Sequence, residues 1–323
     1  MGHLTRTIAV AAAMPNSADL QIIVTGGTAA RALLEDAGLP HTVVENAEQA
    51  ATLVRKFAPG VVVFDLLRMG PSDFEAIARD ATTVSLSPVF DHLGDVDVLF
   101  HRTSVEDPSW HLPPSHPEIR SGLDYAVVAD RCERIPTEMY RQTLAREYLS
   151  VAVSMGGADA ANKTLEVVRT LRENERKLLL WVLLGEGYSH SYHDLVESAR
   201  GARHEIILAK TNESMWHILG TCAMGILAGG TTTYQAAYAG LPSLNILESA
   251  DRRFLTDELV DAGACRRLGD TLGESLAQLN TAVERLDSQR EDLLAMHLTS
   301  RELIDGEGAS RIARELMELG HDR

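Results

Sequence analysis

The chain has only three cysteines in 323 residues, Cys132, Cys222 and Cys265, and their wide separation fits neither a disulfide framework nor a zinc site. Sparse cysteine is typical of proteins in a reducing compartment. No signal peptide is recognisable. The longest strongly apolar run, residues 178–184, is far shorter than the ~20 residues of a membrane-spanning helix. We therefore expect a soluble, cytoplasmic protein without a transmembrane segment.

Basic residues are also few. The chain has 30 of them and 46 acidic residues, which gives a formal net charge of −16. Such an acidic surface repels phosphate backbones and anionic lipids. Nucleic acid is therefore not an expected partner. A local basic pocket for one phosphorylated small molecule is still compatible with this overall charge.

Signatures of several enzyme classes are missing. The sequence has no Walker loop and no Gly-x-Ser-x-Gly nucleophile elbow, and Gly26-Gly27 does not complete the glycine fingerprint of dinucleotide cofactors. His190 and His193 have the spacing of two metal ligands on a helix, but no carboxylate-rich motif accompanies them. We interpret them as a solvated helix start, and we predict no metal site and no tightly bound cofactor.

Short apolar runs alternate with amphipathic stretches along both halves of the chain, which is typical of βαβ units and mostly parallel sheets. The expected strands are residues 21–25, 41–44, 61–67, 83–86, 96–100, 148–155, 177–184, 204–209, 224–228 and 243–247. The expected helices are residues 28–37, 47–57, 72–80, 163–172, 191–199, 213–222, 232–239, 252–262, 274–291 and 309–319.

A proline-rich loop at 109–117 and a charged stretch at 134–147 separate the two halves. We predict an N-terminal Rossmann-like domain over residues 1–140 and a C-terminal Rossmann-like domain over residues 141–308. A final helix, residues 309–323, is expected to pack back on the N-terminal domain. Ligands of such sheets bind beyond the carboxyl ends of the strands, so the loops at those ends are candidate sites.

The most informative loop is Ala228-Gly229-Gly230-Thr231-Thr232-Thr233-Tyr234-Gln235, which follows an expected strand and opens a helix. Its glycines let a ligand approach the backbone, and the N–H groups and dipole of the helix favour a phosphate. An ordinary capped turn is the alternative. A second strand-to-helix joint contains Gly156, Gly157 and Asp159 and has the same two interpretations.

The segment Gly2-His3-Leu4-Thr5-Arg6 is expected to begin a helix that runs through Ala13. An imidazole at a helix start suits general base catalysis, and Arg6 one turn later suits a phosphate. A frayed terminus without a role is the alternative. Asp65 and Asp91 follow strands of the first half. We interpret both as cap or turn residues, with contact to a sugar as the alternative.

In their order along the chain, five segments resemble motifs of the UDP-sugar hydrolases of pseudaminic acid and spore-coat polysaccharide biosynthesis (PseG/SpsG), within the MurG-like GT-B superfamily. The first four are Gly-His-x-x-Arg at 2–6, Ser-x-Gly-Gly-x-Asp at 154–159, Asn-x-x-Met at 212–215, and the Ala-Gly-Gly-Thr-Thr loop followed by Gly240-Leu241-Pro242. The fifth is Asp305-Gly306-Glu307-Gly308-Ala309-Ser310-Arg311.

The resemblance implies an α/β protein of GT-B type, with two Rossmann-like domains, parallel sheets and a small-molecule nucleotide-sugar in the interdomain cleft. UDP is the expected nucleotide and belongs to the substrate rather than to a cofactor. His3 would be the catalytic residue that activates water against the anomeric carbon. The residues expected to bind the substrate are Arg6, Gly156, Gly157, Asp159, Asn212, Met215, Gly229, Gly230, Thr231, Thr232, Thr233 and Gln235.

Three features depart from the family. The strand that precedes the family's histidine motif has no counterpart before Gly2, so either the start is misassigned or the first sheet lacks a strand. Gln235 stands where the family has glutamate, and a carboxamide has only one accepting oxygen for the ribose hydroxyls. Residues 247–254 replace the family's Asn-Gln segment, which suggests a different sugar and leaves another nucleotide as an alternative to uridine.

Three hypotheses follow. A nucleotide-sugar hydrolase that releases UDP and a free amino or deoxy sugar is favoured by the Gly-His-x-x-Arg motif. The first alternative is a glycosyltransferase that uses a nucleotide-sugar donor on the same frame. The second, suggested by Gln235, is a non-catalytic scaffold that binds a nucleotide-sugar. Nothing in the sequence specifies the oligomeric state.

Overall fold

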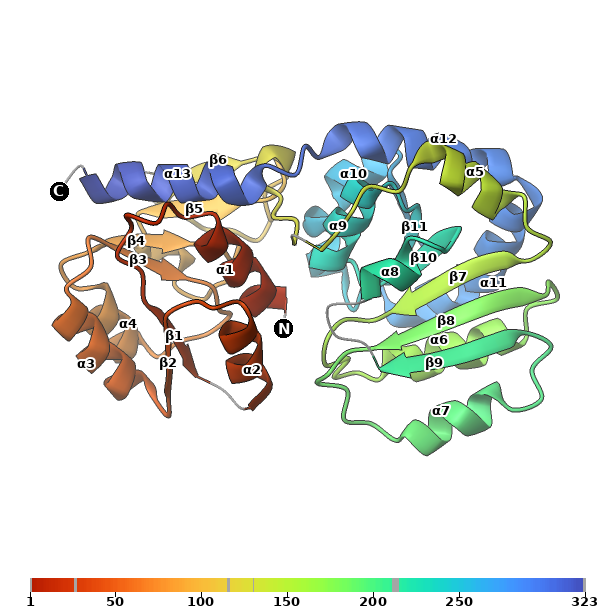
Figure 1. Ribbon diagram of the computed structural model, residues 1–323, viewed down its shortest axis with the longest axis horizontal. Coiled ribbons are helices and arrows are strands. Elements are labelled where there is room, and N and C mark those ends of the chain that lie inside the picture. Colours follow the sequence, from red (N-terminus) through yellow and green to blue (C-terminus); the bar gives the residue numbers. More distant parts are fainter. Residues whose placement is uncertain (1, 26–27, 115–116, 130, 211–214, 322–323) are drawn as a thin grey trace. The chain divides into compact units, whose positions relative to one another are not determined.

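The structure is a computed structural model that describes the chain except residues 1, 26–27, 115–116, 130, 211–214 and 322–323. The described residues form two compact units, each an α/β assembly with parallel strands (Figure 1). The N-terminal unit comprises His3–Val128 together with Gly306–Arg323, and the C-terminal unit comprises Ala129–Asp305 together with Gly2. The predicted α/β class with parallel sheets is thereby confirmed.

The strands of the N-terminal unit pair only in parallel, but they form two sheets. One sheet is β1-β2 and the other is β3-β4-β5-β6. The strands are β1 (Ile22–Thr25), β2 (His41–Val44), β3 (Val61–Phe64), β4 (Thr82–Ser85), β5 (Val98–His101) and β6 (Glu118–Ser121). The helices are α1 (Gly2–Ala12), α2 (Thr28–Asp36), α3 (Ala47–Phe57), α4 (Pro71–Ala78), α13 (Gly308–His321) and the 3₁₀ turns η1 (Leu93–Asp95) and η2 (Leu123–Tyr125).

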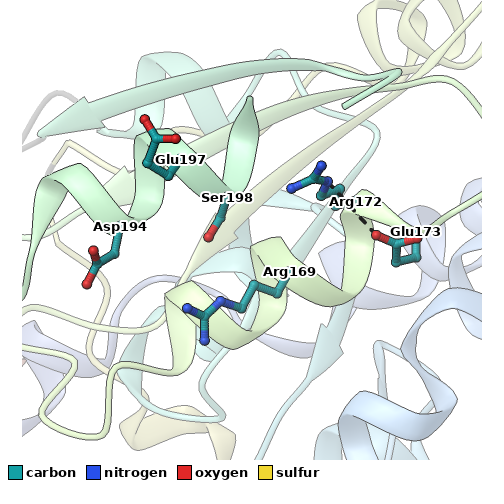
Figure 2. A pocket seen from close by; sticks show the side chains of 6 residues that line it. All are labelled: Arg169, Arg172, Glu173, Asp194, Glu197 and Ser198. Carbon is teal, nitrogen blue, oxygen red and sulfur yellow. Dashed lines mark ion pairs between the residues drawn. The ribbon is translucent and has the colours of Figure 1, made fainter. Parts of the chain in front are cut away.

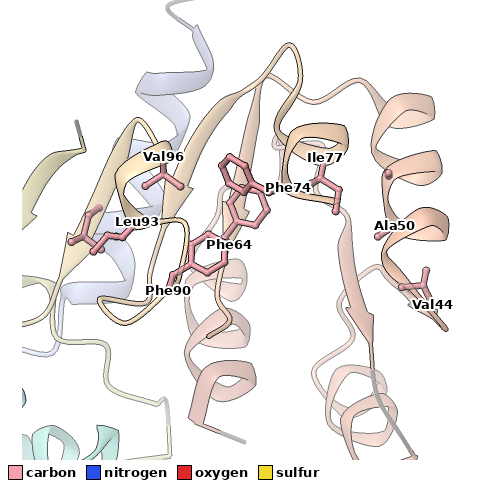
Figure 3. Close-up of a cluster of buried hydrophobic side chains, with 10 residues drawn as sticks. Val44, Ala50, Phe64, Phe74, Ile77, Phe90, Leu93 and Val96 are labelled. Carbon is pink, nitrogen blue, oxygen red and sulfur yellow. The ribbon is translucent and has the colours of Figure 1, made fainter. Parts of the chain in front are cut away.

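Shared hydrophobic cores hold these two sheets together. On α1, Ala9 and Val10 pack in one core with Val84 of β4, while Ala11 packs in another with Ile22 of β1. A third core joins Val44 of β2 to the aromatic side chains around β3 and α4 (Figure 3). The third core and the two sides of α1 therefore join the sheets by side-chain packing.

Helix α13 belongs to the N-terminal unit although it closes the chain. Ile312 and Leu316 are buried in the core of β4 and β5. Glu315 accepts hydrogen bonds from Arg120 and from the Tyr125 hydroxyl. Helix α13 begins at Gly308, where a Cβ would collide with the backbone of Ala126. Close packing thus explains one glycine of the Asp305–Arg311 motif.

The C-terminal unit contains one six-stranded parallel sheet with the order β12-β11-β10-β7-β8-β9. Its strands are β7 (Leu149–Ser154), β8 (Leu178–Leu184), β9 (Glu205–Lys210), β10 (Met224–Leu227), β11 (Ser243–Asn245) and β12 (Cys265–Arg267). Its helices are α5 (Thr137–Leu144), α6 (Lys163–Arg172), α7 (Tyr192–Ala199), α8 (Met215–Leu219), α9 (Thr231–Ala239), the 3₁₀ helix η3 (Ala250–Leu255), α10 (Asp257–Asp261), α11 (Leu272–Ser288) and α12 (Arg290–Leu303).

Some elements differ from those expected. Strands β6 and β12 and helices α5 and α12 were not predicted. The single helix expected over 252–262 is wrong, because the chain forms η3 and then α10, with Thr256 at φ −133° between them. Residues 129–140 lie in the C-terminal unit, where Ile135 donates its N–H to Ala239 and Arg134 donates to the carbonyl of Arg301.

Over the described part of the chain, no helix is both long enough and apolar enough to cross a membrane.

Candidate active site

The sheet order of the C-terminal unit defines where a ligand is expected. From β7 the chain extends the sheet outward through β8 and β9, and it then returns to build β10, β11 and β12 on the other side (Figure 1). The order therefore reverses between β7 and β10, which is the topological switch point where open α/β sheets bind ligands. The two glycine loops predicted from sequence follow these same strands.

The start of α9, after β10, is open to an anion. Its N-cap is Gly230, which has no side chain to cap the helix, and the first turn contains no acidic residue. Gly229 is buried with φ +70°, and a Cβ there would collide with the Leu247 side chain, so only glycine fits. A helix start without a side-chain cap presents N–H groups and the positive end of the dipole. A phosphate is the ligand that suits these features.

The three threonines of this loop have different environments. Thr231 and Thr232 are half-buried and occupy the first turn of α9. Thr233 is buried, and its hydroxyl donates to Oδ1 of Asn245 at 2.9 Å. Thr233 therefore ties α9 to the end of β11.

The start of α6, after β7, is already occupied by a carboxylate of the chain itself. Asp159 has a left-handed backbone (φ +43°) and is 6% exposed. Its Oδ1 accepts from the N–H of Lys163 at 2.9 Å, and its Oδ2 accepts from the N–H of Thr164 at 2.8 Å. Asp159 thus acts as the anion of this helix start. The structure gives Asp159 a capping role, and the substrate contact that the resemblance implies stays a prediction.

The loop that follows β8 supports the Gly156-Gly157 loop and was not singled out from sequence. A Cβ on Gly185 would collide with the backbone of Gly157, so the two loops approach as closely as glycine allows. Tyr188 donates its hydroxyl to the side chain of Asn162 at 2.8 Å, and the ring of His190 hydrogen-bonds the carbonyl of Asp159 at 2.8 Å. The pair Gly185-x-Gly187 after an apolar run was the available signal.

Two further predicted residues are described and one is not. Gln235, one turn into α9, is 5% exposed, and its carboxamide makes no hydrogen bond to another described residue. Met215 is half-buried and opens α8. Asn212 lies outside the described residues.

In the N-terminal unit, three side chains of α1 converge on one carboxylate. Asp65 directly follows β3, and its Oδ1 lies 2.6 Å from Nδ1 of His3. Arg6 donates through Nε to Oδ2 at 2.9 Å and through a terminal nitrogen to Oδ1. The Thr7 hydroxyl donates to Oδ2 at 3.2 Å. The i, i+3 and i+4 spacing places His3, Arg6 and Thr7 on one face of the helix.

The carboxylate of Asp65 is held in its charged form. Burial would by itself raise its pKa, but hydrogen bonds from His3 and Arg6 and the nearby guanidinium charge outweigh burial and lower the pKa below 3.8. The side chain of Asp65 is 5% exposed, whereas that of His3 is 38% exposed. The sequence interpretation of Asp65 as a cap or turn residue is therefore incomplete. Asp91, in contrast, accepts from the N–H of Met69 as a turn residue.

Arg6 was predicted to contact a phosphate, but the structure commits it to Asp65. The residue is 7% exposed, and two of its nitrogens donate to that one carboxylate. A bidentate arginine–carboxylate pair is rigid and strong. The geometry therefore supports a role for Arg6 in holding Asp65, and its predicted phosphate contact stays a prediction.

Two buried cysteine thiols are held in their neutral form. Burial raises the pKa of Cys222 and of Cys265 to about 12, so these thiols stay protonated. In the ranges that the structure covers, no three histidine, cysteine, aspartate or glutamate side chains gather as metal ligands would.

A polar hollow between α6 and α7 lies apart from the glycine loops (Figure 2). It is lined by Arg169, Arg172, Glu173, Asp194, Glu197 and Ser198. The charged groups form ion pairs with one another or with neighbours, such as Arg172 with Glu173 and Arg169 with Glu166. Exposed ion pairs of this kind are solvated surface features, and they do not by themselves indicate a ligand site.

No family model matches the chain. The spore coat polysaccharide biosynthesis protein SpsG of Bacillus subtilis (strain 168) is 24% identical over 206 residues, which are 62% of this chain and 58% of SpsG. The chain is thus similar to SpsG over part of its length, and its fold is of GT-B type. The matched region is thus less than two thirds of the SpsG chain.

Solved structures agree with this fold over nearly the whole chain. Acinetobacter baumannii MurG superposes with a TM-score of 0.67 at 14% identity, covering 98% of this chain and 96% of MurG. Anabaena Alr3699/HepE, in a complex with UDP, superposes with a TM-score of 0.69 at 12% identity, covering 98% and 96%. These likenesses confirm the predicted GT-B type, and at such identities they show the fold alone.

Some of the predicted residues lie together within each unit. The C-terminal unit brings Gly156, Gly157, Gly229 and Gly230 to the two sides of its switch point. The N-terminal unit brings His3 and Arg6 together on Asp65.

Proposed function

We propose that the chain is an enzyme that binds a nucleotide-sugar, with UDP as its nucleotide, and hydrolyses the bond between the diphosphate and the anomeric carbon. One observation carries the proposal: the α9 start has no cap, while the neighbouring α6 start is filled by Asp159. The similarity to SpsG, which is named for polysaccharide biosynthesis, and the UDP held by HepE support the same ligand class.

The diphosphate is assigned to the α9 start. Gly230 leaves the backbone accessible there, and the hydroxyls of Thr231 and Thr232 are available as donors. Gln235 lies four residues after Thr231 and therefore on the same face of the helix. Its carboxamide, which has no partner among the described residues, is assigned to the ribose hydroxyls.

His3 is assigned as the general base. Water attacks the anomeric carbon while the bond from that carbon to the diphosphate oxygen breaks, and UDP departs with the bonding electrons. The proton of the water passes to His3. The charge that develops on the leaving diphosphate is stabilised by the α9 N-terminus without a metal ion. The products are UDP and the free sugar.

A glycosyltransferase is the second candidate, because an acceptor hydroxyl in place of water would use the same diphosphate site and the same base. The likeness of the fold to MurG favours including it. The scaffold hypothesis is weaker, because the partly exposed His3 is held by a buried carboxylate, an arrangement that a purely binding protein does not need.

Calorimetric titration with UDP, CMP, GDP and TDP at fixed salt tests the ligand, and micromolar binding of UDP alone, about −8 kcal/mol, is expected. UDP-sugars are then incubated without an acceptor. Release of UDP with loss of activity in His3→Ala supports hydrolysis. Slow release that an added acceptor accelerates indicates transfer instead. Binding of UDP with equally slow turnover by both proteins would establish the scaffold, and no nucleotide binding would overturn the proposal.

A further inference from the structure

We propose that Asp65 is a positioning residue that fixes His3 as the Nδ1–H tautomer, so that Nε2 is the atom that takes the proton from water. This inference rests on the proposed role of His3 as the base, and it assigns a function to a residue that was interpreted from sequence as a cap.

The hydrogen-bond geometry determines the tautomer. A charged carboxylate only accepts, so the 2.6 Å contact between Asp65 Oδ1 and His3 Nδ1 requires that Nδ1 carry the hydrogen. In a neutral imidazole the other nitrogen, Nε2, is then the acceptor. Since the His3 side chain is 38% exposed and that of Asp65 is 5% exposed, the ring is anchored from the buried side.

Arg6 completes the arrangement. Its guanidinium donates twice to Asp65 and lies 3.2 Å from Nδ1 of His3. Because arginine has no acceptor and the hydrogen on Nδ1 points to the carboxylate, this third contact is not a hydrogen bond but a close positive charge. Arg6 therefore matches the charge of Asp65 and fixes both carboxylate oxygens, and Thr7 adds a further donor to Oδ2.

The alternative is a purely structural role, in which Asp65 only links the first turn of α1 to the end of β3. Both roles predict lower stability when the carboxylate is removed. Only the positioning role predicts that the effects of changing His3 and Asp65 on turnover overlap, because a misoriented base and an absent base stop the same proton transfer.

The test uses Asp65→Asn, His3→Ala and the double variant in the full chain, with UDP release from a UDP-sugar as the assay. Asp65→Asn is expected to lower kcat by about 10²- to 10⁴-fold. KM and UDP affinity should stay near those of the wild type, since the phosphate site lies in the other unit. The double variant should be no slower than His3→Ala alone.

Nuclear magnetic resonance provides a readout that does not depend on turnover. Long-range ¹H–¹⁵N correlation, with the His3 signals assigned by their loss in His3→Ala, should show the Nδ1–H tautomer in the wild type. In Asp65→Asn the Nε2–H form should be populated, because the asparagine NH₂ can donate to Nδ1.

The outcomes separate this inference from the proposed function. Asp65→Asn within three-fold of wild-type kcat, or an Nε2–H tautomer in the wild type, would overturn the inference. A wild type that shows the Nδ1–H tautomer but turns over no UDP-sugar would refute the proposed function and leave the assigned geometry standing. If Asp65→Asn does not fold, the tautomer of His3 in the wild type still tests the inference.

Discussion

Placing a carboxylate on the first turn of α9 should reduce nucleotide binding without reducing stability. In Thr232→Asp, the new charge lies beside the helix start to which we assign the diphosphate. Two charges 4 Å apart repel by about 4 kcal/mol at an effective dielectric constant of 20. Because Thr232 is only half-buried, we expect about 1–3 kcal/mol, a loss of roughly 5- to 150-fold in affinity for UDP.

The same substitution should stabilise the fold slightly, since an acidic side chain at a helix N-terminus contributes about 0.3–1 kcal/mol. Affinity and stability therefore change in opposite directions, which general damage to the fold would not produce. Thr232→Asn is the matched control, because it has nearly the same shape without the charge. Calorimetry measures affinity and urea unfolding measures stability. If the aspartate and asparagine variants bind UDP equally well, the diphosphate does not lie at the start of α9.

Three further predictions follow from the described contacts. Asp159→Asn removes the charged cap of α6 and should lower the free energy of unfolding, measured in urea, by about 0.5–2 kcal/mol. The affinity for UDP should not change. A large loss of affinity would show that this loop binds the ligand. Gly308→Ala should lower the free energy of unfolding by about 1–3 kcal/mol, because the new Cβ collides with the backbone of Ala126. Gly273→Ala is the control and should not destabilise the protein, because Gly273 lies in a helix and has open space around it. Burial alone would lower the pKa of His92, but hydrogen bonds to a carboxylate and a carbonyl and nearby acidic charges raise it above 6.5. The protonated His92 therefore stabilises the fold by about 0.5 kcal/mol. This contribution is complete below pH 6.5 and is lost as the pH rises through the folded-state pKa. In His92→Gln, the free energy of unfolding measured against pH should no longer show this decrease.

Sequence periodicity predicted the central strands because they are apolar on both faces. All of β7 is buried, and β8 is an unbroken apolar run, which leaves little ambiguity about a strand in a parallel sheet. The short outer strands lack this signal. Strand β6 has the sequence Glu-Ile-Arg-Ser with exposed ends, and β12 consists of one cysteine and two arginines. Such segments become strands because a neighbour offers them a hydrogen-bonding edge, and local sequence does not encode the neighbour.

The candidate residues were predictable as residue types in loops but not in their roles. The glycines before α9 were assigned correctly to a strand-to-helix joint because glycine and threonine report directly on local backbone. The role of Asp159 depends on a left-handed backbone at φ +43°, which turns its carboxylate back onto the first N–H groups of α6. The contact of His3 with Asp65 joins residues 62 positions apart, so it depends on which strand end α1 meets.

The two carboxylates explain why the remaining polar groups are free to act on a ligand. Asp159 completes the start of α6 from within the chain, whereas the start of α9 has no side-chain cap. Asp65 is matched by Arg6, so it orients His3 while its own charge is balanced. In the proposed function, the diphosphate site and the oriented base are each assigned to residues of a single unit. We therefore expect the two to fail independently: His3→Ala should keep the affinity for UDP, and Thr232→Asp should keep the tautomer of His3. A variant of either unit that abolished both would contradict this separation.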